Sequence, residues 1–442
     1  MQASSRFLCV ALYSLLAIIP DATSAQAAPL RISLHDAITL ARTQSTAAAL
    51  AGIRAEEFEA RVPQRRADLL PSMSIVAADG ARTYNTASFG LPLPGLDPRG
   101  AVIGPVRTVD LRARIGMSLY DPVARARYHG AEAVADSAGL GHEAAMDAAA
   151  LVAATAYLRT LHADASVNAH AADSSSAAQL LTIAHDVLEA GVGVALDVTR
   201  AEAQLAGVRT QLAAARNEQR QAALALRRAL GMPLTQPLVL TDSLEAPAFI
   251  APAESEAIST ALQARPELRA AAAGAHAAQL ARNAASAARL PAVAAYAEPG
   301  FTSSGYGHLL RTYAVGVQLS VPLFEGGRNE ARLDEQNAAL RVAELRRDDL
   351  TDQVSFEVRS ALLDLNSATE QVALARERLR LAEAEVTQAQ ERFRAGVAGN
   401  ADVITALLAL TTSRGQFIDA ATSLRFAQVS LARAEGRISG IQ

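Results

Sequence analysis

The chain has 442 residues, of which half are apolar, yet only 4% are aromatic and none is Trp. Its formal net charge is −4, so it has no basic surplus of the kind that nucleic-acid-binding surfaces need. A composition rich in Ala, Leu, Arg and Glu is typical of long helices with narrow packing seams, and it argues against a β-sandwich or a dinucleotide-binding enzyme as the whole chain.

Residues 1–27 have the pattern of a secretory signal peptide. Arg6 precedes the apolar run Phe7–Pro20, and Ala25-Gln26-Ala27 supplies small residues for cleavage. The run is shorter than the roughly 20 residues that a membrane-spanning helix requires. Cys9, the single Cys, lies inside the run with no small residues before it, which argues against a lipid anchor. We therefore expect an exported mature chain without disulfide bonds.

The two halves of the mature chain repeat one another. Three alignments carry the repeat, at offsets of 220, 204 and 205: Pro71 with Pro291, Tyr120 with Phe324, and Ala190-Gly191-Val192 with Ala395-Gly396-Val397. The drop from 220 to 204 assigns about 16 extra residues to the first half, and the Pro/Gly-rich segment Phe89–Val106 is where we expect them. The sequence thus predicts a first repeat at 28–230, a linker at 231–252 and a second repeat at 253–442.

A heptad pattern predicts long helices. From Val354 to Phe393, apolar or small residues are spaced alternately by four and three positions, which is a coiled-coil seam. Between Ala149 and Leu188 the same stripe is weaker and is interrupted at His170 and Ser174. A helix of about 66 residues is roughly 100 Å long, and two medium helices stacked end to end would match it. We expect long helices at Val123–Leu188 and Arg328–Arg394, and medium helices at Ser33–Leu70, Leu196–Leu230, Ala253–Leu290 and Ala401–Arg437.

Four segments alternate between apolar and polar residues as strands do: 71–85, 107–120, 291–301 and 312–324. Transmembrane strands and half-buried sheets of soluble domains share this alternation, so the pattern alone leaves both open. Four strands cannot close a barrel in lipid, so a membrane location requires several copies. Two copies would supply eight strands, which side chains would fill, and three copies would supply twelve. Polar residues on the inward face need water, which favours the wider twelve-stranded barrel. The predicted lumen-facing residues are Asp110, Arg112, Arg114, Gln318 and Ser320.

The segment Val315–Arg328, VGVQLSVPLFEGGR, resembles the last strand of the TolC-like outer-membrane factor family, which leads through Pro and a Gly pair into a long helix. Residues 392–397, RFRAGV, are similar to that family's second helical hairpin tip, and the resemblance covers essentially the whole mature chain. It implies a mainly α fold with membrane β-structure. Three chains would form a 12-stranded outer-membrane β-barrel that continues into the periplasm as a hollow coiled-coil α-barrel. It also implies a homotrimer surrounded by outer-membrane lipid, with a periplasmic adaptor (membrane fusion) protein and an inner-membrane pump as partners.

The hairpin tips are predicted at 190–197 and 395–402, where a gate and a docking site would lie. Glycines permit the turns between helices, and an Asp follows each turn. Each Asp could simply stabilise the N-terminus of its helix through its charge. Alternatively, copies of the Asp from several chains could form a charged ring around a narrow pore. The predicted gate residues are Gly191, Gly193, Gly396, Gly399, Asp197 and Asp402.

The resemblance adds roles to these Asp residues. It implies that Asp402 contributes to a periplasmic constriction and that Asp197 helps to hold adjacent hairpins closed, with opening by an iris-like untwisting. Ala398 stands where some members have Arg, and Thr405 where some have a second acidic residue. We therefore expect neither an Arg-based latch nor a second ring of acidic residues in this chain.

We do not expect an enzyme. The sequence contains none of the zinc-protease, serine-hydrolase or phosphate-binding-loop motifs, and its eight His are scattered. We predict no catalytic residue, cofactor or metal, and an exit duct that passes small molecules from an inner-membrane pump and the periplasm to the exterior. Two alternatives stay open, namely a duct for type I protein secretion and a soluble periplasmic coiled-coil adaptor. The matched pairs of strands argue against the adaptor, and the exported substance would be selected largely by the pump.

Overall fold

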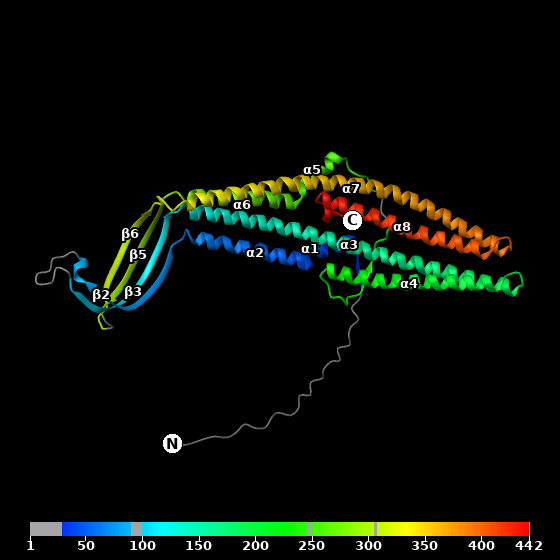
Figure 1. Cartoon of the computed structure of the whole chain (residues 1–442), viewed down its shortest axis with the longest axis horizontal. Helices are drawn as coiled ribbons and strands as arrows, with labels where there is room; N and C mark the ends of the chain where they lie inside the picture. The colour runs from blue at the N-terminus through cyan, green and yellow to red at the C-terminus, as the bar shows by residue number, and fades with distance from the viewer. Residues whose placement is uncertain (1–28, 90–99, 246–248, 305–306, 442) are drawn as a thin grey trace, which may run out of the picture.

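The computed structural model describes four stretches of the chain: 29–89, 100–245, 249–304 and 307–441. The predicted signal peptide, residues 1–27, lies outside them, as do residues 90–99 of the predicted Phe89–Val106 loop. The chain forms a bundle of long, nearly parallel helices with an antiparallel sheet at one end (Figure 1). Within the described stretches, no helix is both long enough and apolar enough to cross a membrane.

Two helices, α3 with 68 residues and α7 with 67, extend along the whole bundle. At 1.5 Å per residue each is roughly 100 Å long. On α7 the heptad positions Val354, Val358 and Leu365 are buried, as a packing seam requires. The α-helices of the described part are α1 (Leu34–Gln44), α2 (Thr46–Ala67), α3 (Pro122–Glu189), α4 (Ala195–Ala229), α5 (Glu254–Ala264), α6 (Pro266–Ala287), α7 (Arg328–Arg394) and α8 (Asn400–Ala434).

The segments 33–70 and 253–290, predicted as one helix each, form two helices each. Ser45 has an extended backbone that ends α1, and its hydroxyl accepts a hydrogen bond from the Ala48 amide in the first turn of α2. Arg265 is extended between α5 and α6 because Pro266 follows it, and a proline ring disfavours helical geometry in the preceding residue. Both pairs still run along a long helix, α1 and α2 on α3, and α5 and α6 on α7.

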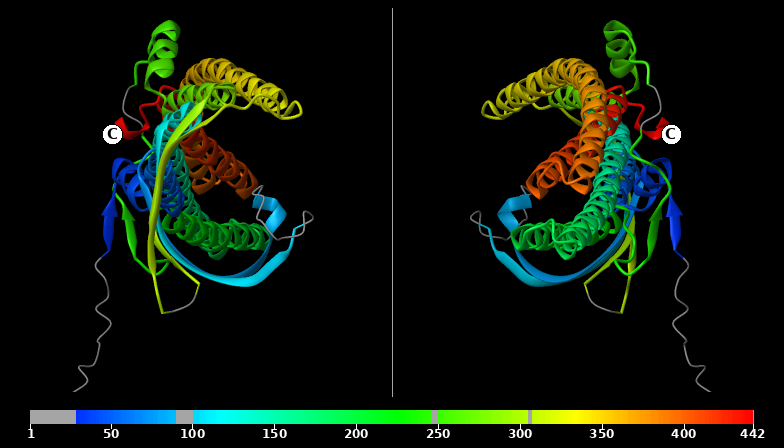
Figure 2. Two further views of the ribbon diagram at one scale, coloured as in Figure 1. Left: turned by 90° about the vertical axis from the view of Figure 1, so that its left-hand side faces the viewer. Right: turned by 90° about the vertical axis from the view of Figure 1, so that its right-hand side faces the viewer.

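The helices form one curved layer. Near the sheet, α3 lies between α2 and α6, and α6 packs against α7. In the other half, α3 lies between α4 and α8, and α8 packs against α7. Seen along the long axis, helices and sheet curve in the same sense, so the chain has a concave and a convex side (Figure 2).

The sheet has the order β2–β3–β5–β6, with every neighbouring pair antiparallel. Its strands are β2 (Ser72–Asn85), β3 (Val102–Tyr120), β5 (Ala292–Ser303) and β6 (Leu310–Ser320). β3 begins five residues before the predicted position of 107. β6 ends at Ser320 instead of continuing to 324, since Pro322 lacks the amide that would extend the ladder.

A short parallel strand pair holds the predicted linker, residues 231–252, at the middle of the bundle. β1 (Leu30–Ile32) pairs with β4 (Leu238–Leu240). The fully buried Tyr157 of α3 lies beneath them, with its hydroxyl 2.9 Å from an oxygen of Asp242. Burial first, and then the Asp242 carboxylate, raise the pKa of Tyr157, so the phenol stays neutral and donates to Asp242.

Candidate functional site

Most odd-numbered residues of the sheet form an exposed apolar face, which is interrupted at its outer end by the ion pair of Asp79 and Arg107. In β6, Val315 is 71% exposed, Val317 66% and Leu319 64%. The strand register continues this face across the other strands with Phe301, Leu111, Ile115, Met117, Met73 and Ile75, all of them exposed. Exposed apolar surface of this extent marks contact with a membrane or a partner protein.

The five predicted lumen-facing residues all lie on the opposite face, because they occupy even-numbered positions in the same register. There Arg112 Nε is 2.7 Å from Asp110 Oδ2, and Arg114 Nε is 3.4 Å from an oxygen of Glu298. Gln318 lines a hollow together with Tyr296 and Glu298, and Ser320 is the next even residue along β6. This face is therefore polar and charge-balanced.

Glu298 belongs to this cluster but was missed by the sequence analysis. It lies within 4 Å of both Arg112 and Arg114. The signal in β5 is weak because its neighbours are mostly Ala and because Pro299 follows directly. Even-numbered spacing from Tyr296 would have placed it on the polar face.

Two glycines on the polar face stand directly opposite large side chains. Gly300 pairs with Arg112, and a Cβ there would come within 2.7 Å of Arg112 Cγ and 2.5 Å of the Leu111 carbonyl oxygen. Gly316 pairs with Tyr296, whose hydroxyl would be 2.7 Å from an added Cβ. The glycines thus leave room for the Arg and Tyr side chains to lie across the neighbouring strand.

At the other end of the bundle, the helical tips turn on two glycines. Gly191 has a φ of +75° and Gly396 a φ of +70°, the left-handed conformation that ends a helix. Gly193 has no such φ, but a Cβ on it would come within 3.0 Å of Val187 Cγ1. Gly399 has φ −82° and ψ 161°, which any residue adopts, and it has free space around it. A left-handed turn is therefore observed at Gly191 and Gly396, whereas Gly399 begins α8 as its N-cap in an ordinary extended conformation.

Asp197 and Asp402 lie in the first turns of α4 and α8. Neither helix is capped by a side chain, so both carboxylates act on the helix ends only through their charge. Asp197 is partly buried, with Arg200 Nη1 3.9 Å away. Asp402 is exposed and forms no ion pair within the described part of the chain. Asp402 is thus the more accessible charge of the two.

Asn400 is a tip residue that the sequence analysis missed. It is fully buried at the start of α8, and its Nδ2 donates a 2.7 Å hydrogen bond to the backbone oxygen of Asp197 at the start of α4. The repeat offset of 205 aligns Asn400 with Ala195, so the bond occurs once and not twice per chain. That difference between the halves was the available signal.

Partly buried ion pairs join the helices near the middle of the layer. Arg433 of α8 pairs with Glu267 of α6, and Arg265 pairs with Glu357 of α7. Burial alone would raise the pKa of Glu267, but backbone hydrogen bonding, Arg433 and Arg265 outweigh it and hold this pKa below its ordinary 4.5. At Asp147, burial raises the pKa above 3.8 despite the nearby arginines.

In the part of the chain that the structure describes, histidine and acidic side chains do not converge into a metal centre. Among the residues that the structure describes, no group of three or more His, Cys, Asp or Glu could hold a metal ion. His162 and His129 each contact one carboxylate, of Asp419 and Glu132 respectively, at 2.9 Å. These are single surface contacts.

Comparisons with known proteins define the class. The model of the family described as "Outer membrane efflux protein" matches residues 37–232 and 257–437. The chain therefore belongs to the outer membrane efflux protein family, which confirms the resemblance drawn from its sequence and places the chain in the outer membrane.

The chain has low sequence identity to individual relatives and to solved structures. The chain is 26% identical over 413 residues to Protein CyaE of Bordetella pertussis, covering 92% of this chain and 84% of that protein. It is 26% identical over 261 residues to outer membrane efflux protein BepC of Brucella suis, covering 58% and 56%. Among solved structures, the CmeC outer membrane channel of Campylobacter jejuni superposes with a TM-score of 0.78 at 18% identity, covering 92% and 86%. The open state of the MtrE outer membrane channel of Neisseria gonorrhoeae superposes with a TM-score of 0.76 at 19% identity. The match covers 92% of this chain and 89% of that chain. These structures confirm the predicted fold of the chain.

Proposed function

We propose that three copies of this chain form an exit duct of a tripartite efflux system, which passes small molecules from the periplasm and an inner-membrane pump across the outer membrane. The lumen would be lined by the polar face of the sheet and continued by the concave side of the helices. The duct makes and breaks no bond. It needs three parts: a water-filled passage, a gate, and a surface on which a partner protein docks.

One observation carries the proposal: a four-stranded sheet with an apolar face and two unpaired edges. β2 and β6 are the edge strands, and each pairs on one side only within the described sheet. Unpaired backbone groups are excluded from hydrocarbon, so in lipid β2 of one copy must pair with β6 of the next. Three copies give twelve strands, enough to leave an aqueous lumen. A soluble adaptor would have no use for such a face.

The helical tips are the proposed gate and dock. Val192 and Val397, one on each tip and related by the repeat, are 79% and 71% exposed. Apolar side chains held out at both tips favour a protein partner, which we propose to be a periplasmic adaptor that links the duct to the pump. Asp402 of three copies would form a negatively charged ring at the constriction, and Asp197 would help to keep neighbouring hairpins closed.

Disulfide cross-linking tests the trimer, because the single Cys of the chain lies in the predicted signal peptide. Cysteines would be placed in pairs, one at Met73 or Ile75 of β2 and one at Val315 or Val317 of β6. We expect at least one pair to give a ladder that ends at three copies on a non-reducing gel, while each single-cysteine variant stays monomeric. A ladder that ends at two copies, or no ladder from any pair, would contradict the twelve-stranded duct.

Conductance tests the gate. In a planar bilayer, Asp402→Ala should weaken block by a trivalent cation added on the side of the tips, because three carboxylates leave the constriction together. Glu385→Ala is the matched control, since it removes an exposed acid from α7 away from the tip. If Asp402→Ala leaves conductance and block unchanged, Asp402 has no part in the gate.

A further inference from the structure

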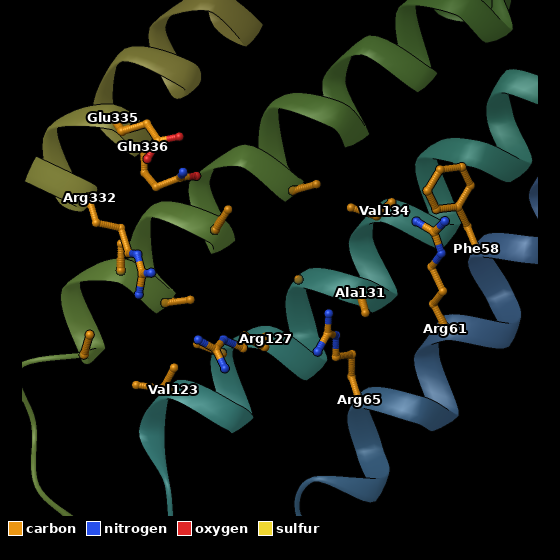
Figure 3. A pocket seen from close by; sticks show the side chains of 17 residues that line it. Phe58, Arg61, Arg65, Val123, Arg127, Ala131, Val134, Arg332, Glu335 and Gln336 are labelled. Atoms are coloured by element: carbon orange, nitrogen blue, oxygen red, sulfur yellow. The ribbon is translucent and has the colours of Figure 1, made fainter. Parts of the chain in front are cut away.

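A hollow of about 570 Å³ lies between α2, α3, α6 and α7, close to the sheet (Figure 3). Its floor consists of small apolar side chains, chiefly alanines of α6 with Val123 and Val134 of α3. A volume of this size falls within the range of roughly 300–1,000 Å³ that is usual for small-molecule sites, which combine an apolar lining with a few polar groups.

Four guanidinium groups surround this floor and face only one acidic lining residue. Arg61 and Arg65 come from α2, Arg127 from α3 and Arg332 from α7, and Glu335 is the acid. Figure 3 shows Arg65 reaching up from α2 and Arg332 reaching down from α7, with the Arg127 guanidinium between them and turned away from Arg65. The hollow therefore carries a positive excess although the whole chain is negative.

The four arginines differ in their partners. Arg61 pairs with Glu57 and lies 4.8 Å above the ring of Phe58, and Arg65 has Asp68 at 3.9 Å. Arg127 and Arg332 have no carboxylate within ion-pair distance in the described part of the chain. Their donors are thus available, and a bound anion would also relieve the repulsion among the cations.

The hollow opens on the same side as the polar face of the sheet. Arg65 and Arg127 line a second hollow nearer the strands, together with Tyr296, Glu298 and Gln318 of the polar face. On the proposed duct, that side is the lumen. A molecule in this site would therefore be a solute in transit and not a lipid.

We propose that this hollow binds amphipathic anions, with an apolar body on the alanine floor and a carboxylate, sulfonate or phosphate between Arg127 and Arg332. Planar guanidinium groups match the oxygens of such anions, and the small side chains of α6 let a flat ring lie against the helix. The inference rests on the proposed duct for its place in the lumen, and it names a class of substrate for that duct.

Titration calorimetry of the full protein in lipid nanodiscs tests the site with two matched probes. Naphthalene-1-sulfonate carries the anion, and 1-naphthylmethylammonium carries a cation on the same ring. We expect the sulfonate to bind and the ammonium to bind much more weakly. Arg127→Gln and Arg332→Gln should each weaken sulfonate binding by about tenfold. Arg125→Gln is the control, because residue 125 lies about 200° around α3 from residue 127 and should leave binding unchanged.

Equal affinity for the two probes, no sulfonate binding, or an equal loss in Arg125→Gln would overturn the site. Conductance of the same purified protein in a planar bilayer distinguishes loss of the binding site from failure to form a channel. Protein that conducts but does not bind the sulfonate refutes the site alone. Protein that binds the sulfonate but forms no channel keeps the site and refutes its place in a lumen.

Discussion

Asn400 joins the two helical tips of one chain by donating a 2.7 Å hydrogen bond to the backbone oxygen of Asp197. The donor lies at the start of α8 and the acceptor at the start of α4, so the bond connects the two hairpins. Val198, Phe393 and Val403, near the same helix ends, belong to a buried apolar cluster that joins the two hairpins. Movement of one hairpin away from the other must break this bond.

We expect Asn400→Ala and Asn400→Asp to raise the open probability of the channel in a planar bilayer. The Asp variant keeps the side-chain shape but replaces the donor with an acceptor that faces a carbonyl oxygen. Loss of one hydrogen bond is worth about 1 kcal/mol, which shifts a two-state equilibrium by about fivefold. Thr405→Ala is the control, since its hydroxyl bonds only within α8, to Ala401 O. Wild-type gating in both Asn400 variants would show that the bond does not hold the tips.

Periodic patterns within single segments of the sequence predicted most of the helices and strands. The heptads of α7 and the alternation of β6 follow from side-chain periods of 3.5 and 2 residues, which a single segment displays. The break at Ser45 was missed because its cap is one hydroxyl within an unbroken helical pattern. The partners of Asn400 and Glu298 were missed for another reason. They lie far away in the sequence, and only the packing of hairpins and the register of strands bring them together.

The two left-handed glycines of the tips should be sensitive to any substitution, whereas Gly399, the N-cap of α8, should accept Ser. Gly191→Ala and Gly396→Ala each place a Cβ in a left-handed conformation at a cost of about 1 kcal/mol. Hydrogen–deuterium exchange of the tip amides should therefore become about fivefold faster. Gly399→Ser should exchange no faster than wild type, because the backbone there is extended, no atom lies within 4 Å and Ser suits the N-cap position that Gly399 holds in α8. Similar exchange in all three variants would contradict these turn roles.

Three glycines of the sheet differ in how much space an added Cβ would have. Gly300→Ala drives a Cβ onto the Leu111 carbonyl oxygen, which the backbone cannot move aside, and overpacking of this kind costs about 1–3 kcal/mol per chain. Gly316→Ala meets only the outer end of the Tyr296 ring, which can rotate. Gly80→Ala, on the same polar face, meets nothing within 4 Å. We expect the yield of trimer from outer membranes to fall in the order Gly80→Ala, Gly316→Ala, Gly300→Ala. Full yield from Gly300→Ala would mean that the observed register is wrong.

Acid should weaken the middle of the helical layer through Glu267. The pKa of this carboxyl is lower in the folded chain than its ordinary 4.5, so the ionised form stabilises the fold above that pH, and the contribution is lost as the pH falls below it. Thermal unfolding in detergent should show Glu267→Gln to be less stable than wild type at pH about 7, because Arg433 loses its partner and Arg265 keeps only Glu357. The difference in stability should close between pH about 5 and 3. Asp348→Asn is the control, since its ion pair with Arg347 is solvent-exposed and contributes little. A gap between Glu267→Gln and wild type that stays constant down to pH about 3 would show that ionisation of Glu267 does not stabilise the layer.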